Sequence, residues 1–541
     1  MKKYKSLFFG FLLVTVINSI FSKSVLLNSG SNSFFFQERF ISLYNSLIHW
    51  DFFPTINELA NGGLGYPTPL FYNNWYLYPF ALLKGFNLSN EMITLIFVWL
   101  LNYLTGLVIY MVGRKYTTHD LKIFFVTLIF IINPYRIFLI LKTARYPELL
   151  AQTIVIVVFY FFIESLYKND RKYYIGLVIS LFLLTITHNI TTLLTIIALI
   201  ILFAVNYKRI TKEIFINFFK YGLLFIGCAS FYIFPIIEQQ KFQSLFVESN
   251  PLNKLSDSYK EITLVQSLIN SIFQFQMVET INIFFIIFFI IILFKNRELK
   301  PLSITIFIMF LLELVFFNFK FFDDTFINVI QFHTRFYSVI CPLISILILQ
   351  NKFNFKMKRV YLQTLVGFYF IASMFILVFY VDLNNSNINR KQLSDTELTY
   401  QVGTGYEYAP ISLSNYINVQ ADSFDSNILK IKKLNNIKYL NNHGKYKLKD
   451  KYNELDIDYE DSDGIITVPI MNYKGYVAEV DGIEVPINTS DYGLVKVDTG
   501  KKSGNLTIEY RKTLVQKISG ILSILSFIFM YLILYKNRKK T

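Results

Sequence analysis

Charged residues are scarce in this sequence, at 16% of its 541 residues, whereas soluble domains carry about 25%. Hydrophobic residues reach 54%. They gather in long apolar stretches such as 123–140, 151–166, 281–294 and 365–381. These stretches exceed ordinary core helices and approach the roughly 20 residues that a bilayer span needs. The composition therefore excludes a water-soluble fold and predicts a polytopic α-helical membrane protein in a lipid bilayer.

Cysteine and histidine are also rare. The two cysteines, Cys228 and Cys341, lie in apolar segments, where a thiol behaves as a small hydrophobic group. The sequence alone is compatible with a disulfide between them and also with two free thiols. The five histidines lack the spacing of a metal-binding pair, so no metal site is predicted. The sequence also lacks a phosphate-binding loop, a dinucleotide fingerprint and a Ser-His-Asp arrangement, and it identifies no cofactor.

The net charge of +15 does not indicate a nucleic-acid partner. Lys and Arg lie in short clusters between the apolar stretches, for example at 2–5, 114–122 and 536–540, rather than along one continuous face. These clusters fall in alternate connections, and the other connections are longer and poorer in basic residues. By the positive-inside rule, both termini are expected in the cytoplasm of a cell-membrane protein.

Twelve spans are predicted. The start of the chain has the basic and apolar character of a signal peptide, but 18–22 offers no small-x-small cleavage site, so we expect an uncleaved first span. The aromatic segment 67–86, in the first outer loop (27–91), must not cross if the charge alternation is to hold, and is predicted to be re-entrant or interfacial. The spans lie near 6–26, 92–113, 121–141, 148–167, 172–187, 190–207, 214–237, 279–295, 301–319, 327–350, 359–381 and 513–536.

A polar region interrupts the spans near the C-terminus. We predict a multi-span membrane domain at 1–381, an extracytoplasmic β-rich domain at 382–512, and a C-terminal membrane anchor at 513–541. The stretch 384–389 has the composition of a linker. From Gly464 onward, alternating residues and an Asp481-Gly482 turn predict a small β-sandwich. Its strands are expected at 465–470, 476–480, 494–497 and 506–510.

Short motifs along the chain carry a resemblance to a known family. They lie at 30–40, 51–54 and 60–67, at Pro134-Tyr135-Arg136, Arg145-Tyr146-Pro147-Glu148 and Thr187-His188-Asn189, and at 331–336, 403–410 and 469–476. With these motifs, the chain resembles the YfhO-like bacterial membrane proteins and, more broadly, the C-type-fold glycosyltransferases, whose donor is a polyprenyl-phosphate sugar. The resemblance covers nearly the whole chain and implies a C-type glycosyltransferase-like fold.

One departure from that family affects the expected chemistry. Such proteins usually carry an Asp early in the first outer loop, a His four residues later and an Arg three residues after that. Counting back from Arg39, the first two places hold Asn32 and Phe36. A carboxamide supplies no negative charge with which to activate an acceptor hydroxyl. Either a neighbouring carboxylate substitutes for the Asp, or catalysis is lost.

Two carboxylates are the catalytic candidates. Glu148 follows Pro147 where a helix re-enters the membrane, so the alternative to a site role is an acid that satisfies a helix N-terminus. Glu38 lies beside Arg39, and its alternative is a solvated loop residue. Asp51, Glu58 and Glu238 are further candidate carboxylates in outer positions.

The donor phosphate would need cations, and three arginines map to the outer side. Arg39, Arg145 and Arg335 are predicted to bind substrate, because the planar guanidinium group contacts phosphate oxygens in pairs. For Arg335, snorkelling to the membrane surface is the alternative. His188 and His333 are further substrate-binding candidates, and for each the alternative is a structural hydrogen bond.

The leading hypothesis is a glycosyltransferase that moves a sugar from a polyprenyl-phosphate carrier to a cell-envelope polymer on the outer face. The resemblance implies a teichoic-acid-like acceptor. The alternative is a non-catalytic membrane protein of the same fold that binds or presents a lipid-linked saccharide, which Asn32 and Phe36 favour. A secondary transporter would show inverted repeats and interrupted helices, and neither is evident in the sequence.

Overall fold

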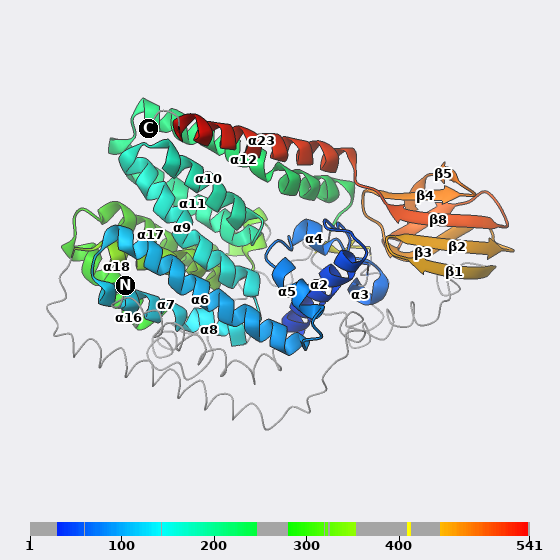
Figure 1. Cartoon of the computed structure of the whole chain (residues 1–541), viewed down its shortest axis with the longest axis horizontal. Helices are drawn as coiled ribbons and strands as arrows, with labels where there is room; N and C mark the ends of the chain where they lie inside the picture. The colour runs from blue at the N-terminus through cyan, green and yellow to red at the C-terminus, as the bar shows by residue number, and fades with distance from the viewer. Residues whose placement is uncertain are drawn as a thin grey trace, which may run out of the picture.

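The computed structural model describes residues 30–58, 60–141, 143–245, 280–318, 320–322, 325–352, 408–412 and 444–538. The predicted spans at 6–26 and 359–381, and the linker at 384–389, lie outside these residues. Figure 1 shows a bundle of long helices, a separate β region, and a group of short helices between them.

The bundle contains helices that are long and apolar enough to cross a membrane. Among the described residues there are five such helices, or six if the bent pair α7 and α8 forms one span. This supports the predicted helical membrane protein, and most predicted ranges agree with helices to within a few residues. The bundle helices are α6 (Asn90–Tyr116), α7 (Asp120–Ile131), α8 (Pro134–Leu141), α9 (Tyr146–Lys168), α10 (Arg171–Thr185), α11 (Asn189–Val205), α12 (Lys212–Phe242), α16 (Ile283–Lys295), α17 (Lys300–Asn318), α18 (Tyr337–Gln350) and α23 (Leu514–Arg538).

Burial separates the central helices from the peripheral ones. In α9, 78% of the apolar window is buried inside the protein, whereas in α23 only 17% is. The last helix, α23, packs along α12, where Ser230 donates to the carbonyl of Ser519 over 2.8 Å. Its remaining apolar surface is exposed. An exposed apolar helix face suits lipid rather than water.

Two predicted spans are irregular. Segment 121–141 is bent by 48° between α7 and α8, because Pro134 has no N–H to continue the helix. Segment 327–350 becomes α-helical only at Tyr337. Before it come the 3-10 turns η3 (Phe326–Ile330) and η4 (His333–Phe336), so the predicted start of this helix is wrong.

The first predicted loop is largely helical. It contains α2 (Gly30–Ile48), α3 (Ala60–Gly63), α4 (Thr68–Phe71) and α5 (Tyr78–Lys84). The segment 67–86 thus forms two short helices rather than one long helix, which agrees with its predicted failure to cross.

The β region consists of two antiparallel sheets. One has the order β1-β2-β8-β4-β5 and the other β3-β7-β6. The predicted hairpin is confirmed, since β4 pairs with β5 across Asp481 and Gly482, whose φ angles are 50° and 80°. The strands are β1 (Lys445–Lys451), β2 (Glu454–Glu460), β3 (Ile465–Met471), β4 (Tyr476–Val480), β5 (Ile483–Val485), β6 (Ile487–Thr489), β7 (Leu494–Asp498) and β8 (Gly504–Tyr510).

A shared apolar core joins the β region to the short helices. Residues of the loop, such as Leu64 and Phe71, are buried with Met471 and Tyr473 of the β region. The backbone N–H of Met471 donates to the carbonyl of Leu64 over 2.8 Å. The segment 408–412 lies in this junction, because Tyr473 donates to the carbonyl of Tyr408 over 2.9 Å.

Candidate functional site

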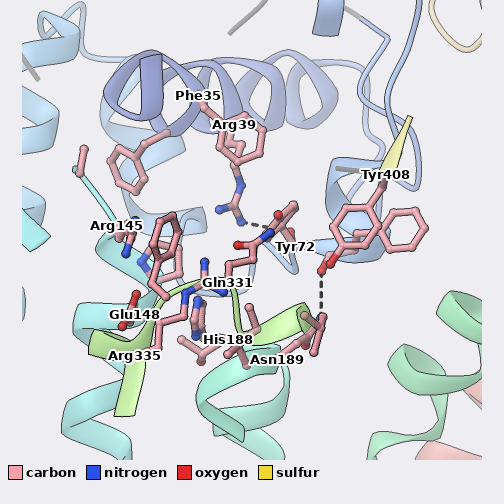
Figure 2. A pocket seen from close by; sticks show the side chains of 18 of the residues that line it. Phe35, Arg39, Tyr72, Arg145, Glu148, His188, Asn189, Gln331, Arg335 and Tyr408 are labelled. Atoms are coloured by element: carbon pink, nitrogen blue, oxygen red, sulfur yellow. Dashed lines mark hydrogen bonds between the residues drawn. The ribbon is translucent and has the colours of Figure 1, made fainter. Parts of the chain in front are cut away.

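A cavity of about 310 Å³ lies where the loop helices, the starts of α9 and α11, and the η3–η4 segment meet. Figure 2 shows the side chains that surround it. Five residues predicted from the sequence line this cavity together, although they come from distant parts of the chain. They are Arg39, Arg145, Glu148, His188 and Arg335.

Two of the arginines share one aromatic ring. The guanidinium carbon of Arg145 lies 4.4 Å from the ring centre of Phe332, and that of Arg335 lies 5.3 Å from it. Arg145 ends the turn between α8 and α9, where Ala144 takes a left-handed φ of 49°. Its Nη1 is buried and has no hydrogen-bond partner among the described residues. A buried cationic donor of this kind favours an anionic ligand.

Glu148 lies in the first turn of α9 and is fully buried. Its Oε1 accepts hydrogen bonds from Tyr135 and, over 2.7 Å, from Ser338. Its Oε2 lacks a partner in the part of the chain that the structure describes. The carboxylate thus accepts from side-chain hydroxyls rather than from the N–H groups at the start of its helix. This favours a site role over the helix-capping interpretation.

His188 is the N-cap of α11. Its Nδ1 accepts from the backbone N–H of Thr191 over 3.2 Å, so in the neutral ring the proton lies on Nε2. Burial lowers the pKa of His188 to about 4, against the pull of the Glu148 charge. The ring is therefore neutral near pH 7 and offers a hydrogen-bond donor rather than a base or a cation.

Arg39 contacts the protein with its whole guanidinium group. It donates to Asn74 over 2.9 and 3.2 Å, to the Tyr76 hydroxyl over 2.9 Å, and to the carbonyls of Tyr72 and Asn73. Only 2% of the residue is exposed. These contacts hold the 72–76 segment against α2, so they favour a structural role for Arg39 at the wall of the cavity.

Two of the candidates predicted from the sequence, Glu38 and His333, do not line the cavity. Glu38 accepts a hydrogen bond from Asn57 over 3.1 Å, and burial raises the pKa of its carboxyl to about 8. His333 begins η4 but is not among the cavity-lining residues. Of the other acids, Asp51 accepts from Tyr452 in the β1–β2 turn, over 2.9 Å. Glu148 is therefore the carboxylate that the structure brings to the arginines.

Phe36 occupies the place where the family resemblance predicts histidine. It is buried, and its ring lies 4.6 Å from that of Tyr146 and 4.9 Å from that of Phe97. It contributes an apolar wall to the cavity. The side chain of Asn32 lies outside the described residues.

Several cavity residues were not predicted as site residues. Tyr408 stacks on Phe71 with ring centres 4.0 Å apart. Asn189 accepts from the Tyr232 hydroxyl over 3.1 Å, and Gln331 has an unusual positive φ of 62°. Asn189, Gln331 and Tyr408 all belong to the motifs quoted for the resemblance, and that was the signal available in the sequence.

An apolar groove of about 680 Å³ adjoins this cavity, between the loop, α12 and α23. Leu70, Phe231, Ile524 and Phe527 are among its lining residues. Tyr232 lines both the groove and the cavity.

No group of three or more His, Cys, Asp or Glu side chains able to hold a metal ion occurs within the described ranges. Both cysteines are free and buried. Comparison with known proteins returned no matching family model and no matching curated protein.

Proposed function

We propose that this protein is a membrane glycosyltransferase that moves a sugar from a polyprenyl-phosphate carrier to a cell-envelope polymer. The observation that carries the proposal is the placement of Arg145 and Arg335 over Phe332, in one cavity with the Glu148 carboxylate. Two guanidinium groups suit a phosphate, and a buried carboxylate beside them suits the activation of a hydroxyl.

In the proposed reaction, Arg145 and Arg335 bind the phosphate of the donor, and His188 donates a hydrogen bond to it from Nε2. Glu148 accepts the proton of the acceptor hydroxyl through Oε2. The hydroxyl oxygen forms a bond to the anomeric carbon, and the bond between that carbon and the phosphate oxygen breaks. The electron pair leaves with the lipid phosphate, whose charge the arginines stabilise.

The apolar groove supports a lipid-linked substrate. It adjoins the cavity that holds the arginines, shares Tyr232 with it, and runs along α23, a helix whose apolar surface is mostly exposed. In the proposed arrangement, the phosphate occupies the cavity while the hydrocarbon chain enters the groove. The C-type fold, twelve spans, cytoplasmic termini and an outer-face cavity in the cell membrane belong to the same proposal.

A second function has its own supporting observation. Phe36 lines the cavity with an aromatic ring where the resembling transferases carry histidine. A protein that binds or presents a lipid-linked saccharide without transferring it would need the arginines and the groove but no base. The two proposals therefore differ in the effect expected of Glu148→Gln.

The first experiment measures binding of undecaprenyl phosphate to the full-length protein in nanodiscs. Arg145→Met and Arg335→Met should each weaken binding about tenfold or more, since a hydrogen bond to a charged group contributes about 1.5–3 kcal/mol. Arg209→Met is the matched control, because Arg209 stacks on Tyr167 at the same 4.4 Å but does not line the cavity. Unchanged binding in both cavity variants would refute a phosphate site.

The second experiment compares envelope polymers from a deletion strain with those from strains complemented by wild type or Glu148→Gln. A transferase predicts a missing hexose or N-acetylhexosamine by mass spectrometry in the deletion strain. Glu148→Gln should lower transfer about a hundredfold or more, as expected for loss of a general base. Binding without any change in the polymers would favour the presenting protein.

A further inference from the structure

A fourth arginine, Arg136 of α8, lies inside the helix bundle. It is fully buried, and its guanidinium carbon lies 5.0 Å from the ring centre of Phe130. Its nitrogens donate to Asn102 and Thr105 of α6, and to the Leu149 carbonyl and Gln152 of α9. All four acceptors are neutral. A cation inside an apolar bundle is costly, so a negative charge elsewhere is expected to compensate it.

The hydrogen bonds lead from Arg136 to such a charge. Arg136 Nη1 lies 3.1 Å from Gln152 Oε1, Gln152 Nε2 lies 3.3 Å from Ser338 Oγ, and Ser338 Oγ lies 2.7 Å from Glu148 Oε1. The chain of contacts thus connects α8, α9 and α18. It ends at the carboxylate that lines the cavity.

The direction of these bonds follows from the chemistry of the groups. A guanidinium group can only donate, so the amide oxygen of Gln152 must face Arg136. The amide NH₂ then faces Ser338, where it can only donate. Because the Ser338 hydroxyl accepts this bond, its proton is available for Glu148. Hydrogen bonds that all run one way polarise one another and favour a negative charge at the accepting end.

We propose that Arg136, acting through Gln152 and Ser338, positions the Glu148 carboxylate and is its remote counter-charge. Arg136 is not among the residues that line the candidate cavity, so it is a positioning residue and not a catalytic one. Ser338 and the Tyr135 hydroxyl both donate to Oε1 of Glu148, which leaves Oε2 without a hydrogen-bond partner among the described residues. The other charged or titratable groups that act on this carboxylate are Arg145, His188 and Arg335.

The first test needs no transfer activity. In the full-length protein in detergent, apparent melting temperatures are compared for Arg136→Met, Glu148→Gln and the double variant. If the charges of Arg136 and Glu148 interact, the melting temperature of the double variant should fall clearly less than the sum of the falls in the two single variants. Glu164, a buried acid that pairs with Lys168 near the end of α9, supplies the matched control, and Arg136→Met with Glu164→Gln should be additive. Additive losses for Arg136 and Glu148, or coupling to Glu164 alone, would overturn the relay.

Gln152→Glu keeps the measurement informative if Arg136→Met does not fold. This change gives Arg136 a carboxylate of its own and removes the donor to Ser338 at nearly constant size. Glu148→Gln should therefore lower the melting temperature less in the Gln152→Glu background than in wild type. An equal loss in both backgrounds would contradict the proposal.

The second test rests on the proposed function. Ser338→Ala should lower kcat at least about tenfold while the KM for the lipid donor stays unchanged, because the arginines that bind the phosphate are intact. Ser338→Thr restores the hydroxyl and should recover most of the lost kcat. Loss of kcat without recovery in Ser338→Thr would count against the relay. If wild type transfers no sugar, the proposed function fails, and the melting-temperature cycle still decides the relay.

Discussion

The hydroxyl of Tyr232 in α12 donates to the backbone carbonyl of Phe71 in α4 over 2.6 Å. This bond ties a membrane helix to the loop at the wall that the cavity shares with the apolar groove. Tyr232→Phe keeps the ring and leaves the buried carbonyl with the weaker contact from Asn189, at 3.5 Å.

We expect Tyr232→Phe to lower the free energy of unfolding by about 1 kcal/mol, the usual net value of a buried hydrogen bond. Thermal unfolding in detergent measures the change. Tyr207→Phe, at a tyrosine that is 66% exposed, is the control and should have almost no effect. Equal melting temperatures for wild type and Tyr232→Phe would show that this bond does not hold the loop.

Arg39 and Arg145 should behave differently when replaced by methionine, although both line the cavity. Arg39→Met removes several buried hydrogen bonds and should lower the melting temperature strongly. Arg145→Met removes a side chain whose Nη1 has no protein partner within the described ranges, so it should affect phosphate binding far more than stability. Melting curves and undecaprenyl-phosphate titrations of both variants test this contrast. If Arg145→Met lowered mainly the melting temperature and Arg39→Met weakened mainly phosphate binding, Arg145 would be the structural residue and Arg39 the phosphate-binding one.

Stability should fall in acid because of His188. Burial lowers the pKa of His188 to about 4 in the folded protein, whereas an exposed histidine has a pKa of about 6.5. The contribution of His188 to the free energy of unfolding is complete above pH 6.5. It is lost as the pH falls toward 4, because the unfolded chain binds the proton more readily than the folded protein does. The free energy of unfolding lost through His188 is about 3 kcal/mol.

His188→Asn supplies another N-cap side chain that does not titrate in this range. The melting temperature of this variant should change less than that of wild type between pH 7 and pH 4. Parallel curves for the two proteins would show that His188 is not buried in its neutral form.

Glu38 should produce the opposite dependence on pH. Its pKa is raised to about 8 by burial, so its contribution to stability is complete below pH 4.5 and is lost as the pH rises toward 8. Glu38→Gln keeps an acceptor for Asn57 and should remove this decline. Glu298→Gln, at a glutamate whose side chain is 74% exposed, is the control and should leave the wild-type curve unchanged. If stability still declined with rising pH in Glu38→Gln, another group would be responsible for the decline.

The proposed topology predicts which positions a membrane-impermeant thiol reagent reaches in intact cells. Asp463→Cys and Glu484→Cys, both exposed in the β region, should react, whereas Glu298→Cys, between α16 and α17, should react only after lysis. The native Cys228 and Cys341 are buried and should give little background. Reaction of Glu298→Cys before lysis, with protection of the β-region cysteines, would invert the orientation.

Local patterns predicted most of the described helices and half of the strands. A long apolar run is a local property, so ranges such as 148–167 and 214–237 agree with α9 and α12. Strands β1 and β2 were missed, although Tyr446, Leu448 and Ile457 alternate with charged residues in the pattern of a half-buried strand. The predicted start of α18 is wrong because hydropathy does not distinguish 3-10 turns from an α-helix.

The sequence by itself determined that the chain is apolar, helical and basic in short clusters, and that Arg145, Glu148, His188 and Arg335 lie near helix starts. These are properties of neighbouring residues. Only the tertiary structure decided that these four side chains line one cavity. It also decided that Arg39 donates its hydrogen bonds to the 72–76 segment and that Glu38 accepts a hydrogen bond from Asn57. The physical reason is that hydrogen bonding and burial depend on which distant segments meet, and no local pattern encodes the partner of a buried polar group.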